Sequence, residues 1–138
     1  MITAHVKGEQ AFSKQTLQTG DALPQNAIWI DLLNPSAEED RHVEMLTGIE
    51  IPTREDMAEI EESSRFYTES GAQYLTAPLV HATNSSKPGV SPVTFIISGG
   101  RLVTVRYAAP TAFGLFESRM SKPGNEFCSL ETDGLMVM

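Results

Sequence analysis

Hydrophobic and polar positions alternate along most of this chain with the two-residue period of β-strands, and change to a helical period in three short stretches. The nearly continuous apolar run from Ala27 to Leu33 is typical of a strand covered on both faces, so it predicts an interior strand of a sheet. The predicted strands are residues 2–8, 11–17, 27–33, 65–69, 73–80, 93–98 and 101–107.

Turn residues indicate how these strands connect. Gly99-Gly100 separates two predicted strands by two residues that accept positive φ, which predicts a tight antiparallel hairpin. Ser70-Gly71 predicts a second hairpin, and the first two strands of the chain are expected to form a third. Residues 19–26 and 83–91 are rich in turn-forming residues and are expected to be loops.

Capping patterns predict two acidic helices in the first half of the chain. Ser36 stands three residues before Glu39, as in a capping box, and Gly48 marks the expected end of that helix. Val43, Met45 and Leu46 would supply its apolar stripe. A second capping-box spacing, Thr53 with Asp56, predicts a short helix that ends near Ile60.

A third helix is expected over residues 112–120, with Phe113 and Phe116 on one face. The final residues, 134–138, form an apolar run without a cap or a polar tail, which is typical of a helix that continues. We therefore expect residues 1–138 to be a single domain of a longer protein.

Composition excludes several classes of protein. A chain of 138 residues and 15.1 kDa suits one domain with its own core, and the lone Cys128 excludes an internal disulfide. The formal charge of −8 has the wrong sign for a nucleic-acid partner. No signal peptide and no apolar run of about 20 residues is present, so these residues are expected to be cytosolic.

No familiar catalytic motif is present. The chain lacks a Gly-rich phosphate loop, a G-x-S-x-G elbow and an H-E-x-x-H pair. His5, His42 and His81 match no zinc spacing, and each is interpreted as a surface residue or a satisfied core residue. Trp29 is expected in the core. Asp31 interrupts an apolar strand, and backbone donors near the next helix N-termini are expected to satisfy its carboxylate.

The unusual feature is an acidic segment between residues 38 and 62. Carboxylate clusters suit hard divalent cations, and Glu55, Glu59 and Glu62 would share a helical face. Spacing alone nevertheless favours a solvated face, with Asp56 serving as the capping-box acid. The acids are Glu38, Glu39, Asp40, Glu44, Glu50, Glu55, Asp56, Glu59, Glu61 and Glu62, with only Arg41 and Arg54 opposing them.

Four segments between about Ala27 and Phe116 form a recognisable set when taken in order. They are Trp29-Ile30-Asp31-Leu32 with Asn34-Pro35, Gly48 to Met57 with its Pro52-Thr53-Arg54-Glu55-Asp56 core, Phe66-Tyr67 with Tyr74-Leu75, and Arg101 to Arg106. Together they resemble the amino-terminal cytoplasmic domain of the CorA family of magnesium transporters.

This resemblance implies an α/β (α+β) fold, a three-layer α/β/α sandwich with a mixed sheet of about seven strands. It also implies a homopentamer at the cytoplasmic face of the bacterial inner membrane, anchored by a stalk helix and transmembrane helices that this chain lacks. Asp56, in the Glu55-Asp56 pair, would take part in a regulatory divalent-ion site between subunits. The function implied is ion sensing for Mg²⁺ transport, not catalysis, with Co²⁺ or Ni²⁺ as other candidate ions.

Three alternatives remain open from the sequence. One is a zinc-transporting relative of the ZntB type, in which case Zn²⁺ is the ion. An enzyme would need Asp31, His42 and Asp56 to converge in one pocket. A purely structural interaction module would need no ion site at all.

Overall fold

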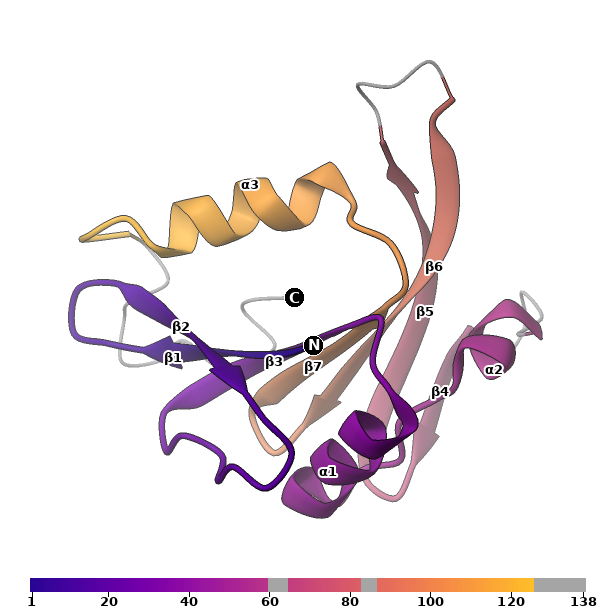
Figure 1. The fold of residues 1–138 in the computed structure, drawn as a ribbon, viewed down its shortest axis with the longest axis horizontal. Helices are drawn as coiled ribbons and strands as arrows, with labels where there is room; N and C mark the ends of the chain where they lie inside the picture. Colours follow the sequence, from indigo (N-terminus) through magenta and orange to yellow (C-terminus); the bar gives the residue numbers. More distant parts are fainter. Residues whose placement is uncertain (60–64, 83–86, 126–138) are drawn as a thin grey trace.

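The computed structural model describes residues 1–59, 65–82 and 87–125 (Figure 1). In chain order, the elements of the described residues are β1 (Ile2–Lys7), β2 (Phe12–Leu17), β3 (Ala27–Leu33), α1 (Ala37–Thr47), α2 (Arg54–Glu59), β4 (Phe66–Glu69), β5 (Ala72–His81), β6 (Gly89–Ser98), β7 (Arg101–Arg106) and α3 (Thr111–Met120). Residues 134–138, predicted to begin a helix that continues, lie outside the described residues.

The strands form one seven-stranded sheet in the order β2-β1-β3-β7-β6-β5-β4. The β3–β7 pair is parallel and the other neighbouring pairs are antiparallel, so the sheet is mixed, as expected. The apolar strand β3 lies between β1 and β7, which confirms its predicted interior position.

The two tight hairpins form where the turn residues predict them. Ser98 pairs with Arg101 across Gly99 and Gly100, whose φ angles are 57° and 74°. Both residues need positive φ, which glycine adopts without steric cost. Ser70 (φ 50°) and Gly71 make the corresponding turn between β4 and β5.

The ribbon of β5 and β6 is longer than predicted. Residues from Gly89 onward, expected in a loop, belong to β6, while residues 83–86 lie outside the described residues. Pro78 and Pro92 stand opposite each other in this ribbon. Both are tolerated because β4 and β7 do not extend alongside them, so no outer strand needs their missing N–H groups.

The helices cover both faces of the sheet, with α1 and α2 on one face and α3 on the other (Figure 1). Both predicted capping boxes form. At α1, Glu39 N donates to Ser36 Oγ at 3.2 Å and Ser36 N donates to Glu39 Oε2 at 3.0 Å. Gly48 ends the helix with φ 73°. The second helix ends at Glu59, and Ile60 lies outside the described residues.

Each face has its own core, so the predicted three-layer sandwich is confirmed. On the α1/α2 side, Val43 and Met57 pack on Ile30, Leu32 and further side chains of the sheet. On the α3 side, Phe113 and Met120 pack with Trp29, Leu102 and Val93. The expectation that Met45 joins the α1 stripe is wrong, since Met45 is 74% exposed and His42 is buried instead. Within the described residues, no helix has the length and apolarity to span a bilayer.

Candidate functional site

The predicted metal residues Glu55 and Asp56 lie side by side in the first turn of α2, and both are exposed. Asp56 caps its own helix, because its Oδ2 accepts from Thr53 N at 3.0 Å while Asp56 N donates to Thr53 Oγ1 at 3.1 Å. These hydrogen bonds lower the pKa of Asp56. The carboxylate is therefore ionised at neutral pH, as a cation ligand must be.

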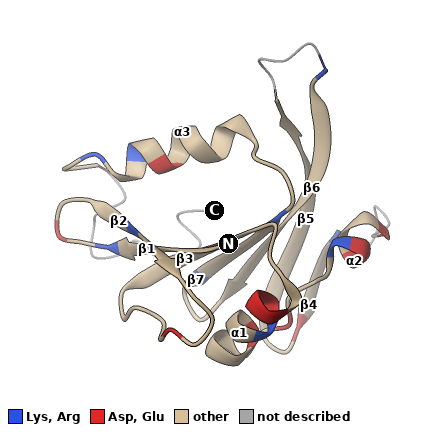
Figure 2. Cartoon of the chain, in the orientation of Figure 1, with Lys and Arg blue, Asp and Glu red and all other residues tan. Residues whose placement is uncertain are grey.

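Asp56 borders a surface hollow of about 380 Å³ with three other carboxylates. Pro52 begins the connection to α2, Glu69 ends β4, and Glu59 ends α2, so the hollow lies where these elements meet. In Figure 2, acidic residues (red) outnumber basic residues (blue) on the helices α1 and α2. The residues that line the hollow are Glu50, Pro52, Asp56, Glu59, Tyr67, Glu69 and Tyr74.

Two tyrosines form the wall of the hollow. The rings of Tyr67 and Tyr74 are stacked, with centroids 4.7 Å apart and planes 5° from parallel. Tyr74 Oη donates to the carbonyl of Glu50 at 2.8 Å. Burial, with a contribution from Tyr67 and Glu69, raises the pKa of Tyr74 to about 12. Burial and then Glu69, Glu50 and Asp56 raise the pKa of Tyr67. The hollow is thus a site of negative potential that favours cations.

Glu55 is not among the residues that line the hollow. Its charge acts on Tyr107, whose pKa is raised by burial first and then by Asp40 and Glu55. The Arg54 guanidinium lies 5.4 Å from the centroid of the Tyr107 ring. Glu55 therefore does not line the hollow beside Asp56, because consecutive residues of a helix diverge by about 100°. Glu62, the third predicted member of the acidic face, lies outside the described residues.

The described residues of one copy of the chain do not complete a metal centre. Among the described residues, no group of three or more His, Cys, Asp or Glu side chains is placed to hold a metal ion. The hollow supplies carboxylates that face a common space without converging on one point.

The enzyme alternative is wrong in its geometry. Asp31 points to the α3 face of the sheet, where it contacts Arg106. His42 belongs to α1, on the opposite face, and its Nε2 lies 2.9 Å from the carbonyl of Asp21. Asp56 is exposed on α2. The three residues share no pocket, whereas the interpretation of His42 as a satisfied core residue is confirmed.

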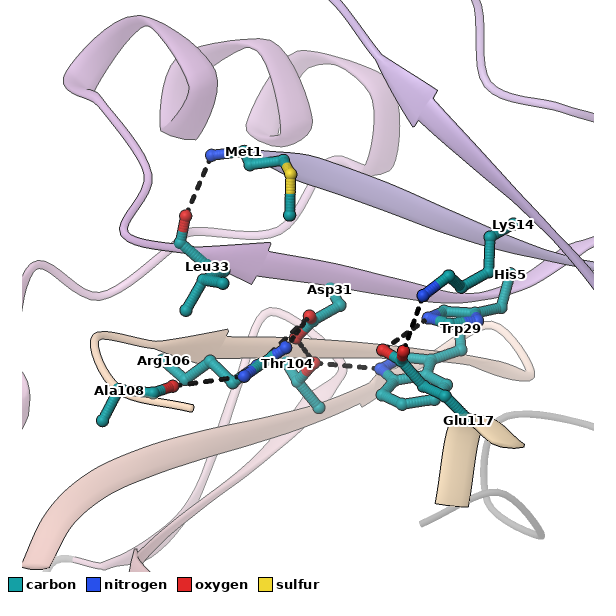
Figure 3. Close-up of polar contacts among 10 residues, drawn as sticks. All are labelled: Met1, His5, Lys14, Trp29, Asp31, Leu33, Thr104, Arg106, Ala108 and Glu117. Atoms are coloured by element: carbon teal, nitrogen blue, oxygen red, sulfur yellow. Dashed lines mark hydrogen bonds and ion pairs between the residues drawn. The ribbon is translucent and has the colours of Figure 1, made fainter. Parts of the chain in front are cut away.

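The expected partners of Asp31 are also wrong, because side chains rather than backbone donors satisfy it (Figure 3). Arg106 Nη2 donates to Asp31 Oδ2 at 2.7 Å, and Thr104 Oγ1 donates to Oδ1 at 2.6 Å. Trp29 Nε1 donates to Thr104 Oγ1 at 2.9 Å, which extends the network. Trp29 is 2% exposed and belongs to the core, as expected.

Arg106 was missed because it is 75 residues from Asp31. One signal was present in the sequence. Arg106 follows Leu102 and Thr104 at a spacing of two in a predicted strand, so it shares their face of the sheet. A buried carboxylate is strongly destabilising without a partner, so a cationic side chain is expected on a neighbouring strand.

Comparison with solved structures defines the fold class. The chain superposes on the soluble domain of CorA from Methanocaldococcus jannaschii with a TM-score of 0.59 and 14% identity, covering 86% of this chain and 45% of that one. The complete structure of the CorA magnesium transporter from the same organism gives a TM-score of 0.58 at 15% identity, with 86% and 36% covered. The fold is therefore of the class found in the CorA soluble domain.

Sequence relatives identify the family. The family model described as CorA-like Mg²⁺ transporter protein matches residues 24–135. The magnesium transport protein CorA of Wolinella succinogenes is 31% identical over an alignment of 105 positions that covers 72% of this chain and 33% of that protein. The protein of that name from Escherichia coli K12 is 33% identical over 94 residues, or 68% of this chain and 30% of that protein. The chain belongs to the CorA-like Mg²⁺ transporter family, and it spans about a third of the length of these curated relatives.

Proposed function

We propose that this chain is the regulatory, ion-sensing domain of a CorA-like Mg²⁺ transporter. In this proposal it lies at the cytoplasmic face of the bacterial inner membrane, within a homopentamer whose stalk and membrane helices lie outside residues 1–138. Membership in the transporter family supports the assignment. Residues 1–138 then form a single domain, and their role is binding rather than catalysis.

The observation that carries the proposal is the exposed, ionised Asp56 at the edge of a hollow with four carboxylates. Carboxylates that face a second copy of the domain would repel those of that copy until a cation neutralises them. The ion therefore stabilises the symmetric assembly by binding it more tightly than the separated one. Asp56 is the proposed ligand, and Glu55, which does not line the hollow, would contribute only through a neighbouring subunit.

Mg²⁺ is the ion that the chemistry of the hollow favours. Its charged lining groups are all carboxylates, and hard oxygen ligands suit Mg²⁺, whereas Zn²⁺ favours His and Cys ligands in protein sites. Co²⁺ and Ni²⁺ are weaker candidates because imidazole, which neither lines nor borders the hollow, suits such ions better. A ZntB-like zinc domain would need nitrogen or sulfur ligands from elsewhere.

Titration of the isolated chain with Mg²⁺ tests whether the site is shared. We expect weak binding, in the range of hundreds of micromolar or above, because one copy supplies only part of the coordination shell. Competition with Zn²⁺, Co²⁺ and Ni²⁺ in the same calorimetric assay ranks the ions. Submicromolar Mg²⁺ binding to the monomer would contradict the shared site.

Mg²⁺-dependent closure of the full-length transporter tests the role of Asp56. Asp56→Asn keeps an oxygen that can accept from Thr53 N but removes the charge, so closure should need at least about tenfold more Mg²⁺. Glu38→Gln removes one exposed charge from α1, away from the hollow, and is the matched control. Unchanged closure in Asp56→Asn would instead support a purely structural interaction module.

A further inference from the structure

His5 on β1 is a buried imidazole that the proposed ion sensing does not use. It is 1% exposed and stacks on Trp29, with ring centroids 4.0 Å apart and planes 13° from parallel. Its Nε2 has no hydrogen-bond partner among the described residues and lies 3.6 Å from Glu117 Oε1, on α3 (Figure 3). A buried ring nitrogen without a partner is costly and usually has a structural reason.

Charges of both signs surround His5. The acidic and basic groups that act on it are Lys14 on β2, Asp31 on β3, Arg106 on β7 and Glu117 on α3. Lys14 Nζ pairs with Glu117 at 2.8 Å, and Arg106 Nη2 pairs with Asp31 at 2.7 Å. A proton on His5 would therefore have to share the Glu117 carboxylate with Lys14, and the attraction of Glu117 and Asp31 is smaller than the cost of placing the charge where water is excluded.

Among the described residues, the helix α3 covers this region. Phe113 and Phe116 of α3 lie over Trp29, with ring centroids 5.9 Å and 6.1 Å away. On the other side, His5 belongs to a strand that pairs with β2 along its whole length and also with β3, where the register shifts between His5 and Val6. Displacing one ten-residue helix is thus a smaller change than opening the sheet, and it would bring the imidazole into water.

We propose that His5 couples the docking of α3 to pH: the helix stays on the sheet while the imidazole is neutral and leaves it when the imidazole binds a proton. This device is separate from the proposed ion site, since the hollow with Asp56 lies where α2 meets β4 and β5. It would make the α3 side of the domain sensitive to acid while the sheet remains folded.

The direction of the effect follows from linkage. Burial, opposed by the weaker attraction of Glu117 and Asp31, lowers the pKa of His5 from 6.5 to about 4. With α3 displaced, the exposed ring would regain its ordinary pKa. Between these two pKa values only the undocked form holds the proton. As the pH falls from 6.5 toward 4, the equilibrium constant for docking should therefore fall roughly tenfold per pH unit. Above pH 6.5 the docking should not depend on this group.

Trp29, the one tryptophan of the sequence, reports on this change directly. In an acid titration of the chain from pH 7.5 to pH 4, we expect its emission to shift to longer wavelength as α3 leaves, while far-UV circular dichroism keeps its strand signal. His5→Phe keeps the stack and cannot titrate, so its emission should stay constant. An equal shift in His5→Phe, or simultaneous loss of the strand signal, would overturn the proposal.

Two further variants keep the test informative if His5→Phe fails to fold. Lys14→Gln and Glu117→Gln remove the same ion pair, so the loss of that pair should weaken the docking of α3 equally in both. Lys14→Gln leaves Glu117 free to compensate a charged His5, whereas Glu117→Gln leaves the charge unopposed beside Lys14. The emission midpoint of Glu117→Gln should lie at least about half a pH unit above that of Lys14→Gln. Coincident midpoints would overturn the proposal.

His42→Gln is the matched histidine control. His42 is also buried, at 5% exposure, but it lies on α1 at the opposite face of the sheet. The difference between the midpoints of Lys14→Gln and Glu117→Gln should persist in this background, because no step of the mechanism involves His42. Loss of that difference would assign the titration to His42 and overturn the role of His5.

Discussion

The core under α1 and α2 consists mainly of aliphatic side chains, with one stacked tyrosine pair and the hydrogen-bonded His42, whereas the core under α3 contains the Asp31–Arg106 ion pair and His5, whose Nε2 has no hydrogen-bond partner among the described residues. On the first face, the polar side-chain contact between strands is the neutral Thr76–Thr94 pair, 2.8 Å apart. On the second, Asp31, Thr104, Arg106 and Trp29 form a connected network.

This difference separates two physical tasks. Apolar burial supplies cohesion that hardly depends on pH or on the identity of individual partners. A buried charged network contributes little net stability, but it penalises any arrangement in which one member loses its partner. The α1/α2 face should therefore tolerate volume-conserving changes, while the α3 face should respond sharply to changes in charge.

The largest effect is expected for Arg106→Met. It leaves the Asp31 carboxylate buried without its cation, so the free energy of unfolding should fall by about 3–5 kcal/mol in a urea titration at pH 7. Adding Asp31→Leu removes the orphaned charge, and the double variant should recover most of the loss. A fall of less than about 1 kcal/mol in the free energy of unfolding of Arg106→Met would show that Asp31 and Arg106 do not form a charged pair.

A smaller effect is expected for Ile30→Ala, next to Asp31 but on the opposite face. Ile30 is 0% exposed in the α1/α2 core, and its truncation leaves a cavity that should cost about 2–4 kcal/mol. Because no titrating group is involved, the loss should be equal at pH 5.5 and pH 7.5. A loss that changes between these pH values would show that the two faces are coupled.

The threonine pair should be replaceable as a unit. Thr94→Val leaves the buried hydroxyl of Thr76 without its partner and should cost about 1–2 kcal/mol. The double variant Thr76→Val with Thr94→Val should regain most of this, because both polar groups are then absent. A double variant as unstable as the sum of the two single ones would mean that this face also depends on its polar contact.

The smallest effect is expected for Asp40→Asn on α1. Burial, with Glu44 and Glu39 nearby, raises the pKa of Asp40 to about 6, and its Oδ1 is buried without a partner among the described residues. The ionised form is disfavoured in the folded state, so the variant should gain about 0.5–1 kcal/mol at pH 7.5, a value reduced for partial exposure. Thermal unfolding should show this gain shrinking as pH falls through 6 and vanishing below about 4.

Asp40 and His5 change the stability of the protein with pH in opposite directions. Stability that depends on Asp40 increases as pH falls, since protonation removes its buried charge, whereas stability that depends on His5 decreases as pH falls. Asp40→Asn and His5→Phe should therefore change the pH profile of unfolding in opposite directions, which two-state analysis of both variants would check.

The local structure of this protein follows from its amino-acid sequence alone. Glycine at Gly99 and Gly100, the capping residues Ser36 and Thr53, and the apolar run of β3 act through near neighbours and intrinsic backbone preferences, so their effects can be read in order along the chain. The family resemblance then supplied the layers and the mixed sheet, and it singled out Asp56.

Which distant side chains meet is set by the tertiary fold. Arg106 reaches Asp31 across 75 residues, and Glu117 approaches His5 from α3, because pairing β3 with β7 and packing α3 over them sets those distances. The helical turn between Glu55 and Asp56 makes them diverge, but which groups surround each of them depends on how α2 packs. Electrostatic interactions depend on distances in space, so spacing along the chain can show that Thr104 and Arg106 share a face but not that they meet Asp31.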